Sequence, residues 1–68
     1  MDKQSVLKEL RMFARCWHRE KLISGSMLDF YQGRYHGASA VLILADIITD
    51  EELKEIDKEA EEEAKISV

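Results

Sequence analysis

Hydrophobic residues recur along the 68-residue chain at the spacing of amphipathic α-helices, in three successive segments. This pattern predicts helices over residues 3–21, 26–46 and 50–65. No proline interrupts the chain, and the helix-favouring residues Ala, Leu, Glu, Lys and Arg are prominent. Because a chain this short can build only one core, residues 1–68 are expected to form a single all-α domain. We expect an antiparallel helical hairpin followed by an acidic C-terminal helix.

Two short segments carry the residues that commonly start helices. Thr49 and Glu52 match the capping box, in which each side chain accepts a hydrogen bond from the backbone N–H of the other residue. This pattern starts the third helix. Ser24 is expected to cap the second helix, with Ser26 as a competing cap.

The first segment carries apolar and basic residues on opposite sides of a helix. The apolar arc predicts the core face, made of Val6, Leu7, Leu10, Phe13, Ala14 and Trp17. Opposite lies the basic stripe, made of Lys8, Arg11, Arg15 and Arg19. Four aligned cations are able to follow a phosphate backbone, so a nucleic-acid-binding or transcription-regulatory protein is the alternative function. The interpretation that we favour is pairing of the basic stripe with the acidic third segment, or simple solvation.

The second segment is apolar on two faces of one helix. Its first face has large side chains suited to a core: Met27, Leu28, Tyr31, Tyr35, Ala38, Leu42 and Ala45. Its second face consists of Phe30, Gly33, Gly37, Ala40, Val41 and Leu44. The residues left for solvent are Asp29, Gln32, Arg34, His36 and Ser39.

The two glycines of this second face need an explanation. Glycine inside a helix costs about 1 kcal/mol relative to alanine, so Gly33 and Gly37 predict that another helix approaches closely. We expect the second face to be a self-association surface that forms a homodimer. The alternative is a monomeric bundle in which the two other helices cover one face each. The self-association interpretation requires that something other than water covers Gly33 and Gly37.

The third segment has one narrow apolar face, made of Leu53, Ile56, Ala60 and Ala64. Charge is distributed unevenly along the chain. Residues 1–45 carry seven Lys and Arg against four Asp and Glu, whereas residues 46–68 carry three against ten, which gives a net charge of −7. We expect the third helix to bind an unidentified protein partner through an acidic surface made of Glu55, Glu59, Glu61 and Glu62. The basic stripe is the other candidate surface for that partner.

The sequence offers no catalytic, cofactor-binding or metal-ligating constellation. Cys16 and His18 are two residues apart and so point to different sides of a helix, and His36 adds no carboxylate at a matching spacing. The serines are isolated, and no glycine-rich phosphate loop is present. The expectation is a protein that is not an enzyme and needs no cofactor.

The single cysteine favours a reducing compartment, and no apolar run is long enough to span a membrane. Asp2 and Lys3 directly after Met1 do not resemble a signal peptide, so a cytoplasmic protein without a membrane segment is expected. No family motif is specific enough to name. The short, acidic, helical profile resembles the small accessory proteins of bacteria and phages. That resemblance implies an inhibitor that binds a larger protein, in the host-cell cytoplasm if a phage encodes it.

Overall fold

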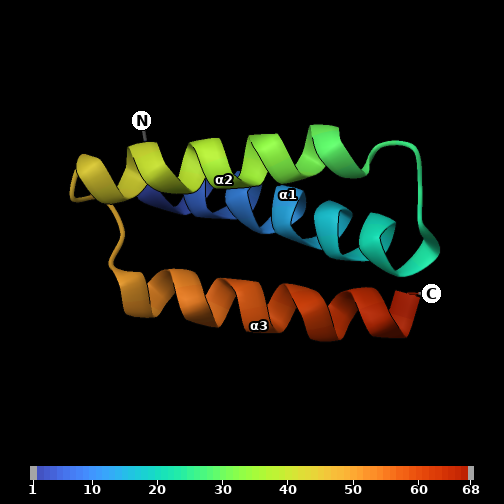
Figure 1. Cartoon of the computed structure of the whole chain (residues 1–68). Coiled ribbons are helices and arrows are strands. Elements are labelled where there is room, and N and C mark those ends of the chain that lie inside the picture. Colours follow the sequence, from blue (N-terminus) through green and yellow to red (C-terminus); the bar gives the residue numbers. More distant parts are fainter. Residues whose placement is uncertain (1, 68) are drawn as a thin grey trace.

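The computed structural model describes residues 2–67, which form three α-helices. Helix α1 spans Lys3–Ile23, α2 spans Leu28–Leu44 and α3 spans Asp50–Ser67, as Figure 1 shows. The prediction of an all-α, three-helix module is confirmed, and no strand occurs between residues 2 and 67. Helix α2 is two residues shorter at each end than predicted. None of the three described helices is both long enough and apolar enough to cross a membrane.

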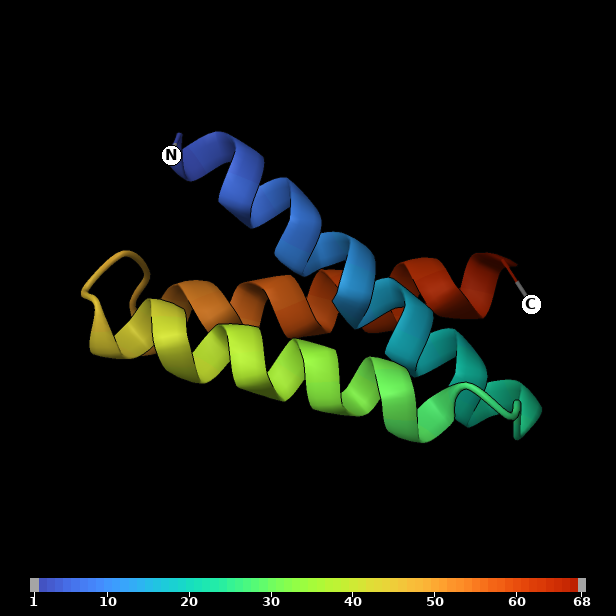
Figure 2. The ribbon, with the colours of Figure 1, turned by 90° about the horizontal axis from the view of Figure 1, so that it is seen from above.

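Helix α1 is the central element of the module. It packs against both α2 and α3, whereas α2 and α3 make few contacts with each other. In the view from above, α1 crosses the other two helices at an angle, and its N-terminal half diverges from α2 (Figure 2). Short loops join α1 to α2 at one end of the module and α2 to α3 at the other (Figure 1).

The core lies where α1 meets the other two helices. Helix α1 contributes Leu10 and Ala14, which have at most 1 % of their surface exposed. The remaining core residues come from all three helices and the loop before α3: Leu7, Tyr35, Leu42, Ile48, Ile56 and Ala60. The predicted apolar arc of α1 and the narrow face of α3 are therefore confirmed as core-facing.

The ends of α1 and α2 have a common cause, a residue in the left-handed conformation. At the end of α1, Ser24 has φ 54° and ψ 42°, and the Gly25 N–H donates to the Glu20 carbonyl. The prediction that Ser24 caps α2 is therefore wrong, because Ser24 terminates α1. The competing prediction for Ser26 is also wrong, because Met27 is the N-cap residue of α2.

Helix α2 ends in the same way, because Asp46 takes a positive φ of 60°. The Asp46 N–H donates to the Ile43 carbonyl and the Ile47 N–H to the Leu42 carbonyl, which together form a Schellman motif. Asp is among the few residues with a side chain that enter this conformation readily, so the helix stops before Asp46.

The start of α3 agrees with the sequence pattern. The Thr49 N–H donates to Glu52 Oε1 at 3.0 Å, and the Glu52 N–H donates to Thr49 Oγ1 at 3.1 Å. The predicted capping box is confirmed. The Thr49 N–H also lowers the pKa of the Glu52 carboxyl group below its usual value, because it stabilises the charged form. Ile48, just before the cap, is buried in the core.

Candidate functional site

The second face of α2 lies on the surface of the chain. All six of its residues are exposed: Phe30, Gly33, Gly37, Ala40, Val41 and Leu44. Leu44 exposes 87 % of its surface and Val41 63 %, values that are high for large aliphatic side chains. The first face faces the core only in part, since Tyr35 and Leu42 are buried whereas Met27 and Ala45 are exposed.

No other helix of the chain approaches the two glycines. A Cβ atom added to Gly33 or to Gly37 would meet no atom within 4 Å outside its own helix and chain neighbours. The close helix approach that these glycines predict is therefore not found within the chain. Either a second molecule covers the second face, or the interpretation of the glycines is wrong.

A groove of about 440 Å³ runs beside the glycines, between α1 and α2. Val6, Leu10 and Phe13 line it from α1, and Gly33 and Gly37 line it from α2. The N-terminal half of α1, which contributes the α1 side of this groove, diverges from α2 in the view of Figure 2. Its walls are mainly apolar, and Gly33, Gly37 and Val41 of the second face are among them.

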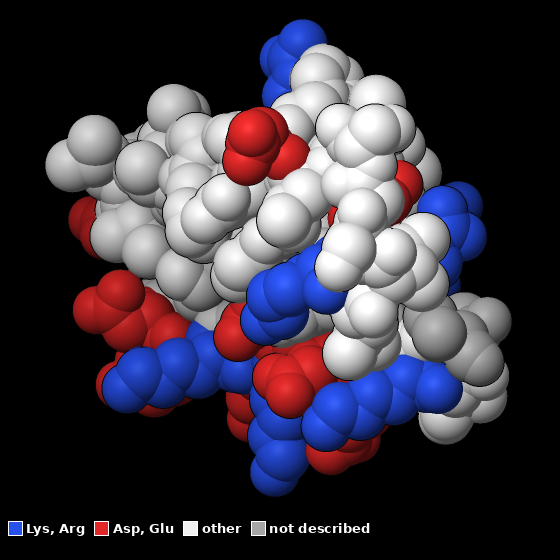
Figure 3. All heavy atoms as spheres, turned by 45° about the vertical axis from the view of Figure 1, so that its right-hand side comes forward, with Lys and Arg blue, Asp and Glu red and all other residues white. Residues whose placement is uncertain are grey.

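Charged side chains gather in the part of the module that contains α3 (Figures 1 and 3). In Figure 3, Lys and Arg are interspersed with Asp and Glu across the lower part of the view, whereas the upper part is mostly uncharged. Two ion pairs between Lys or Arg and Glu join α1 to α3. Arg15 lies 3.2 Å from Glu63, and Lys3 lies 3.4 Å from Glu52.

The structure brings part of the basic stripe to the acidic helix. Arg11 lines small hollows on the seam between α1 and α3 together with Glu55 and Glu59, and all four residues of the stripe are exposed. Of the predicted acidic surface, Glu55, Glu59 and Glu62 are exposed and Glu61 is half-buried. The nearby carboxylates would repel a phosphate backbone, so this arrangement gives the nucleic-acid alternative no support.

Polar residues of the three helices lie close together beside this charged surface. His18 of α1 is 2 % exposed, and its Nε2 lies 2.8 Å from Oδ1 of Asp57 on α3. The Tyr35 side chain of α2 lies near the same carboxylate, and both line one small hollow. Burial, reinforced by the charge of Asp57, raises the pKa of Tyr35 to about 12. Ser39, which was expected to face solvent, is buried and donates to the Tyr35 carbonyl at 2.7 Å.

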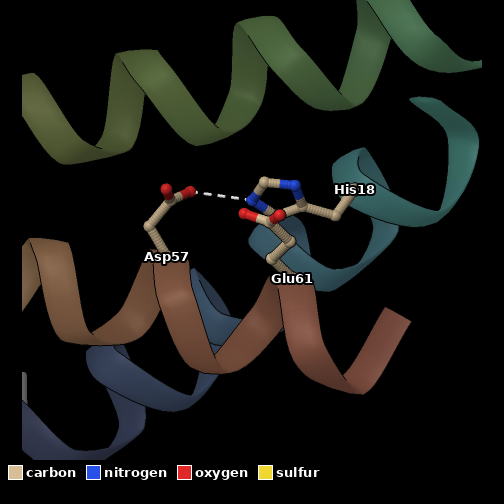
Figure 4. Close-up of side chains that lie close together, drawn as sticks. All are labelled: His18, Asp57 and Glu61. Atoms are coloured by element: carbon tan, nitrogen blue, oxygen red, sulfur yellow. Dashed lines mark hydrogen bonds and ion pairs between the residues drawn. The ribbon is translucent and has the colours of Figure 1, made fainter. Parts of the chain in front are cut away.

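The His18 side chain faces two carboxylates of α3, as Figure 4 shows. Asp57 and Glu61 are one helical turn apart, and one ligand atom from each of them and from His18 lies within 4.8 Å of the others. On its other side the imidazole packs against the Trp17 ring, with 4.5 Å between the ring centroids. These three residues are the group in residues 2–67 whose geometry suits a metal ion.

The sequence pattern did not reveal this group. The spacing along the sequence relates His18 only to Cys16 and His36, and Asp57 and His18 are not among the predicted site residues. A usable signal existed in the i, i+4 spacing of Asp57 and Glu61, which places both side chains on one side of α3. Which residue of α1 faces them depends on the packing of two helices that are far apart in sequence.

Comparisons with protein-family models, with curated proteins and with solved structures found no match to this chain.

Proposed function

We propose that this protein is a non-enzymatic protein–protein interaction module that associates with itself through the second face of α2. The observation that carries the proposal is the exposure of that whole face. Helix α2 packs mainly on α1, and Phe30, Val41 and Leu44 leave 47 %, 63 % and 87 % of their surfaces in water. Contiguous exposed apolar residues of this size commonly mark interaction surfaces.

A second copy of the chain is the occupant that fits this surface best. In a two-fold dimer the same side chains of both protomers are buried, so a short helix contributes its apolar surface twice to the free energy of association. Full burial of a Val, Leu or Phe side chain contributes about 1.5–3 kcal/mol, and these three are already partly buried. A module of this size seldom has more than about 3–5 kcal/mol of net stability, so pairing would also stabilise the fold.

The glycines determine how close the two copies come. With no atom near the Cβ positions of Gly33 and Gly37, the backbone of a second α2 helix is able to approach without displacing a side chain. Such pairs gain many backbone contacts over a short length. The proposal therefore predicts a crossing of two α2 helices at these residues.

Binding of a larger protein is the second part of the proposal. Charged surfaces mainly determine the association rate and the choice of partner. The exposed carboxylates of α3 suit a basic partner surface, as in a small inhibitor or accessory protein. Reversal of Glu59, Glu61 and Glu62 to lysine should abolish capture of that partner and leave the helical circular dichroism signal unchanged. Capture that survives the reversal would instead direct attention to the basic stripe.

Self-association is tested by light scattering coupled to size-exclusion chromatography. We expect the mass of two chains for the natural sequence at micromolar concentration. Leu44→Glu should give the mass of one chain. Ile66→Glu is the matched control, because Ile66 is an aliphatic residue of α3 that is 85 % exposed, close to the 87 % of Leu44. The control should remain a dimer.

Two results would contradict the proposed dimer. The first is a single-chain mass for the natural sequence at concentrations up to about 100 µM, since a dimer weaker than this would contribute little stability. The second is an equal loss of mass in the Leu44→Glu and Ile66→Glu variants, which would show that added charge rather than the second face is responsible.

A further inference from the structure

We propose that His18, Asp57 and Glu61 form a binding site for a divalent transition-metal ion of the zinc class. One imidazole nitrogen and two carboxylates are a donor set that Zn²⁺ and its first-row neighbours accept. Two carboxylates and a neutral imidazole carry a charge of −2, which a divalent ion neutralises. Without an ion, two carboxylates at i, i+4 repel each other.

The distances in the group suit one shared ion. Atoms bonded to the same ion at about 2.0–2.2 Å lie about 3.0–3.5 Å from each other. His18 Nε2 and Asp57 Oδ1 are already 2.8 Å apart, and the largest separation in the group is within 4.8 Å. Glu61 belongs to the exposed edge, where its side chain pairs with Lys65 at 3.4 Å. We expect a change of Glu61 rotamer to bring its carboxylate from Lys65 to the ion.

The surroundings of His18 determine which of its two ring nitrogens is able to bind an ion. The imidazole is 2 % exposed, and within residues 2–67 its buried Nδ1 has no hydrogen-bond partner. The ring therefore meets polar groups only through Nε2, the atom that faces Asp57 and Glu61 (Figure 4). Because the Asp57 and Glu61 side chains are 41 % and 46 % exposed, an ion can enter from solvent and keep water in its remaining positions.

The surroundings of the Asp57 carboxylate and of the His18 ring affect how tightly an ion would bind. Metal-binding carboxylates are usually oriented by further polar groups, and the Tyr35 side chain lies close enough to Asp57 for the two to interact electrostatically. Binding through Nε2 requires that Nε2 carry no proton, so that the proton of the neutral ring is on Nδ1. The resulting buried Nδ1–H has no acceptor among the described residues, which weakens binding. With three protein ligands and this cost, we expect a Kd of about 1–100 µM.

The test uses Zn²⁺ as the probe and the full chain in a Cys16→Ser background, which removes the one thiol. Isothermal titration calorimetry should show one ion per chain. At a free Zn²⁺ concentration ten times the Kd, the melting midpoint should rise by about 5–10 °C, because the ion binds the folded state only. A chelator should reverse the rise.

Three variants separate the site from unspecific binding to acidic residues. Glu61→Gln removes one ligand from the exposed edge and should weaken Zn²⁺ binding by at least about tenfold, and Asp57→Asn should do the same. Glu62→Gln removes an exposed carboxylate next to the site and should leave the Kd unchanged. Wild-type affinity in Glu61→Gln or Asp57→Asn, an equal loss in Glu62→Gln, or no binding up to about 1 mM Zn²⁺ would overturn the proposal.

Discussion

Replacement of Gly33 and Gly37 by alanine is the perturbation that best separates the isolated chain from the proposed dimer. Both glycines lie inside α2, and an added Cβ meets nothing within 4 Å in the single chain. Alanine is more favourable than glycine in an exposed helix interior by about 1 kcal/mol. In a monomer the double substitution should therefore stabilise the fold by about 2 kcal/mol. This gain corresponds to an increase of about 8–16 °C in the melting midpoint.

In a dimer that crosses at the glycines, the same substitution acts in the opposite direction. Two added methyl groups on each helix would separate the two backbones, and overpacking of this kind typically costs about 1–3 kcal/mol. The dimer dissociation constant should then rise by about 5- to 150-fold. The effect of alanine on the fold and its effect on association thus have opposite signs.

The two effects are measured in two backgrounds. In the Leu44→Glu background, which should be monomeric, a circular dichroism melt reports the effect of alanine on the fold alone. In the natural background, sedimentation velocity over a concentration series reports the dissociation constant. A dissociation constant that does not change would refute the close approach of two helices at Gly33 and Gly37. A lower melting midpoint in the monomeric background would refute the conclusion that both glycines have room for a Cβ atom.

Three further predictions concern the stability of the fold. Leu10→Ala removes a side chain that is 1 % exposed and should cost about 2–5 kcal/mol, which is enough to unfold a module of this size, as loss of the cooperative melt would show. Thr49→Ala removes the hydroxyl that accepts a hydrogen bond from the Glu52 N–H and should cost about 1 kcal/mol of stability. A denaturant titration measures this loss, and no change would mean that the cap does not stabilise α3. The pKa of Glu52 is lower in the folded chain, so its stabilising contribution is present above the unfolded pKa and is lost as the pH falls through the folded pKa. As the pH falls through that range, the free energy of unfolding of Glu52→Gln should therefore decrease less than that of the natural sequence. Parallel pH profiles of the two proteins would contradict a stabilising role of the Glu52 carboxylate.

Local signals in the sequence were sufficient for the helices and most of the core. The amphipathic spacing of α1 and α3 identified their buried faces, and the capping box at Thr49 and Glu52 identified where α3 begins. These features depend on residues within a few positions of each other. Ser24 was misassigned because serine suits both a helix start and, less often, a left-handed helix end. The sequence pattern does not show which role it takes.

The tertiary structure decided which residues meet across the helices. The pattern divides α2 into two apolar faces, but only the packing shows that the first face is partly buried and that the second remains in water. Likewise, His18 lies beside Asp57 and Glu61 because of the way α1 packs on α3. His18 and Asp57 are 39 residues apart in the sequence, so no short-range spacing in the sequence indicates their contact. Ser39 was expected in solvent because it is polar, yet it is buried with its hydroxyl satisfied by the Tyr35 carbonyl. Spacing along one helix determines which residues share a side, whereas the packing of that helix on its neighbours determines what each side contacts.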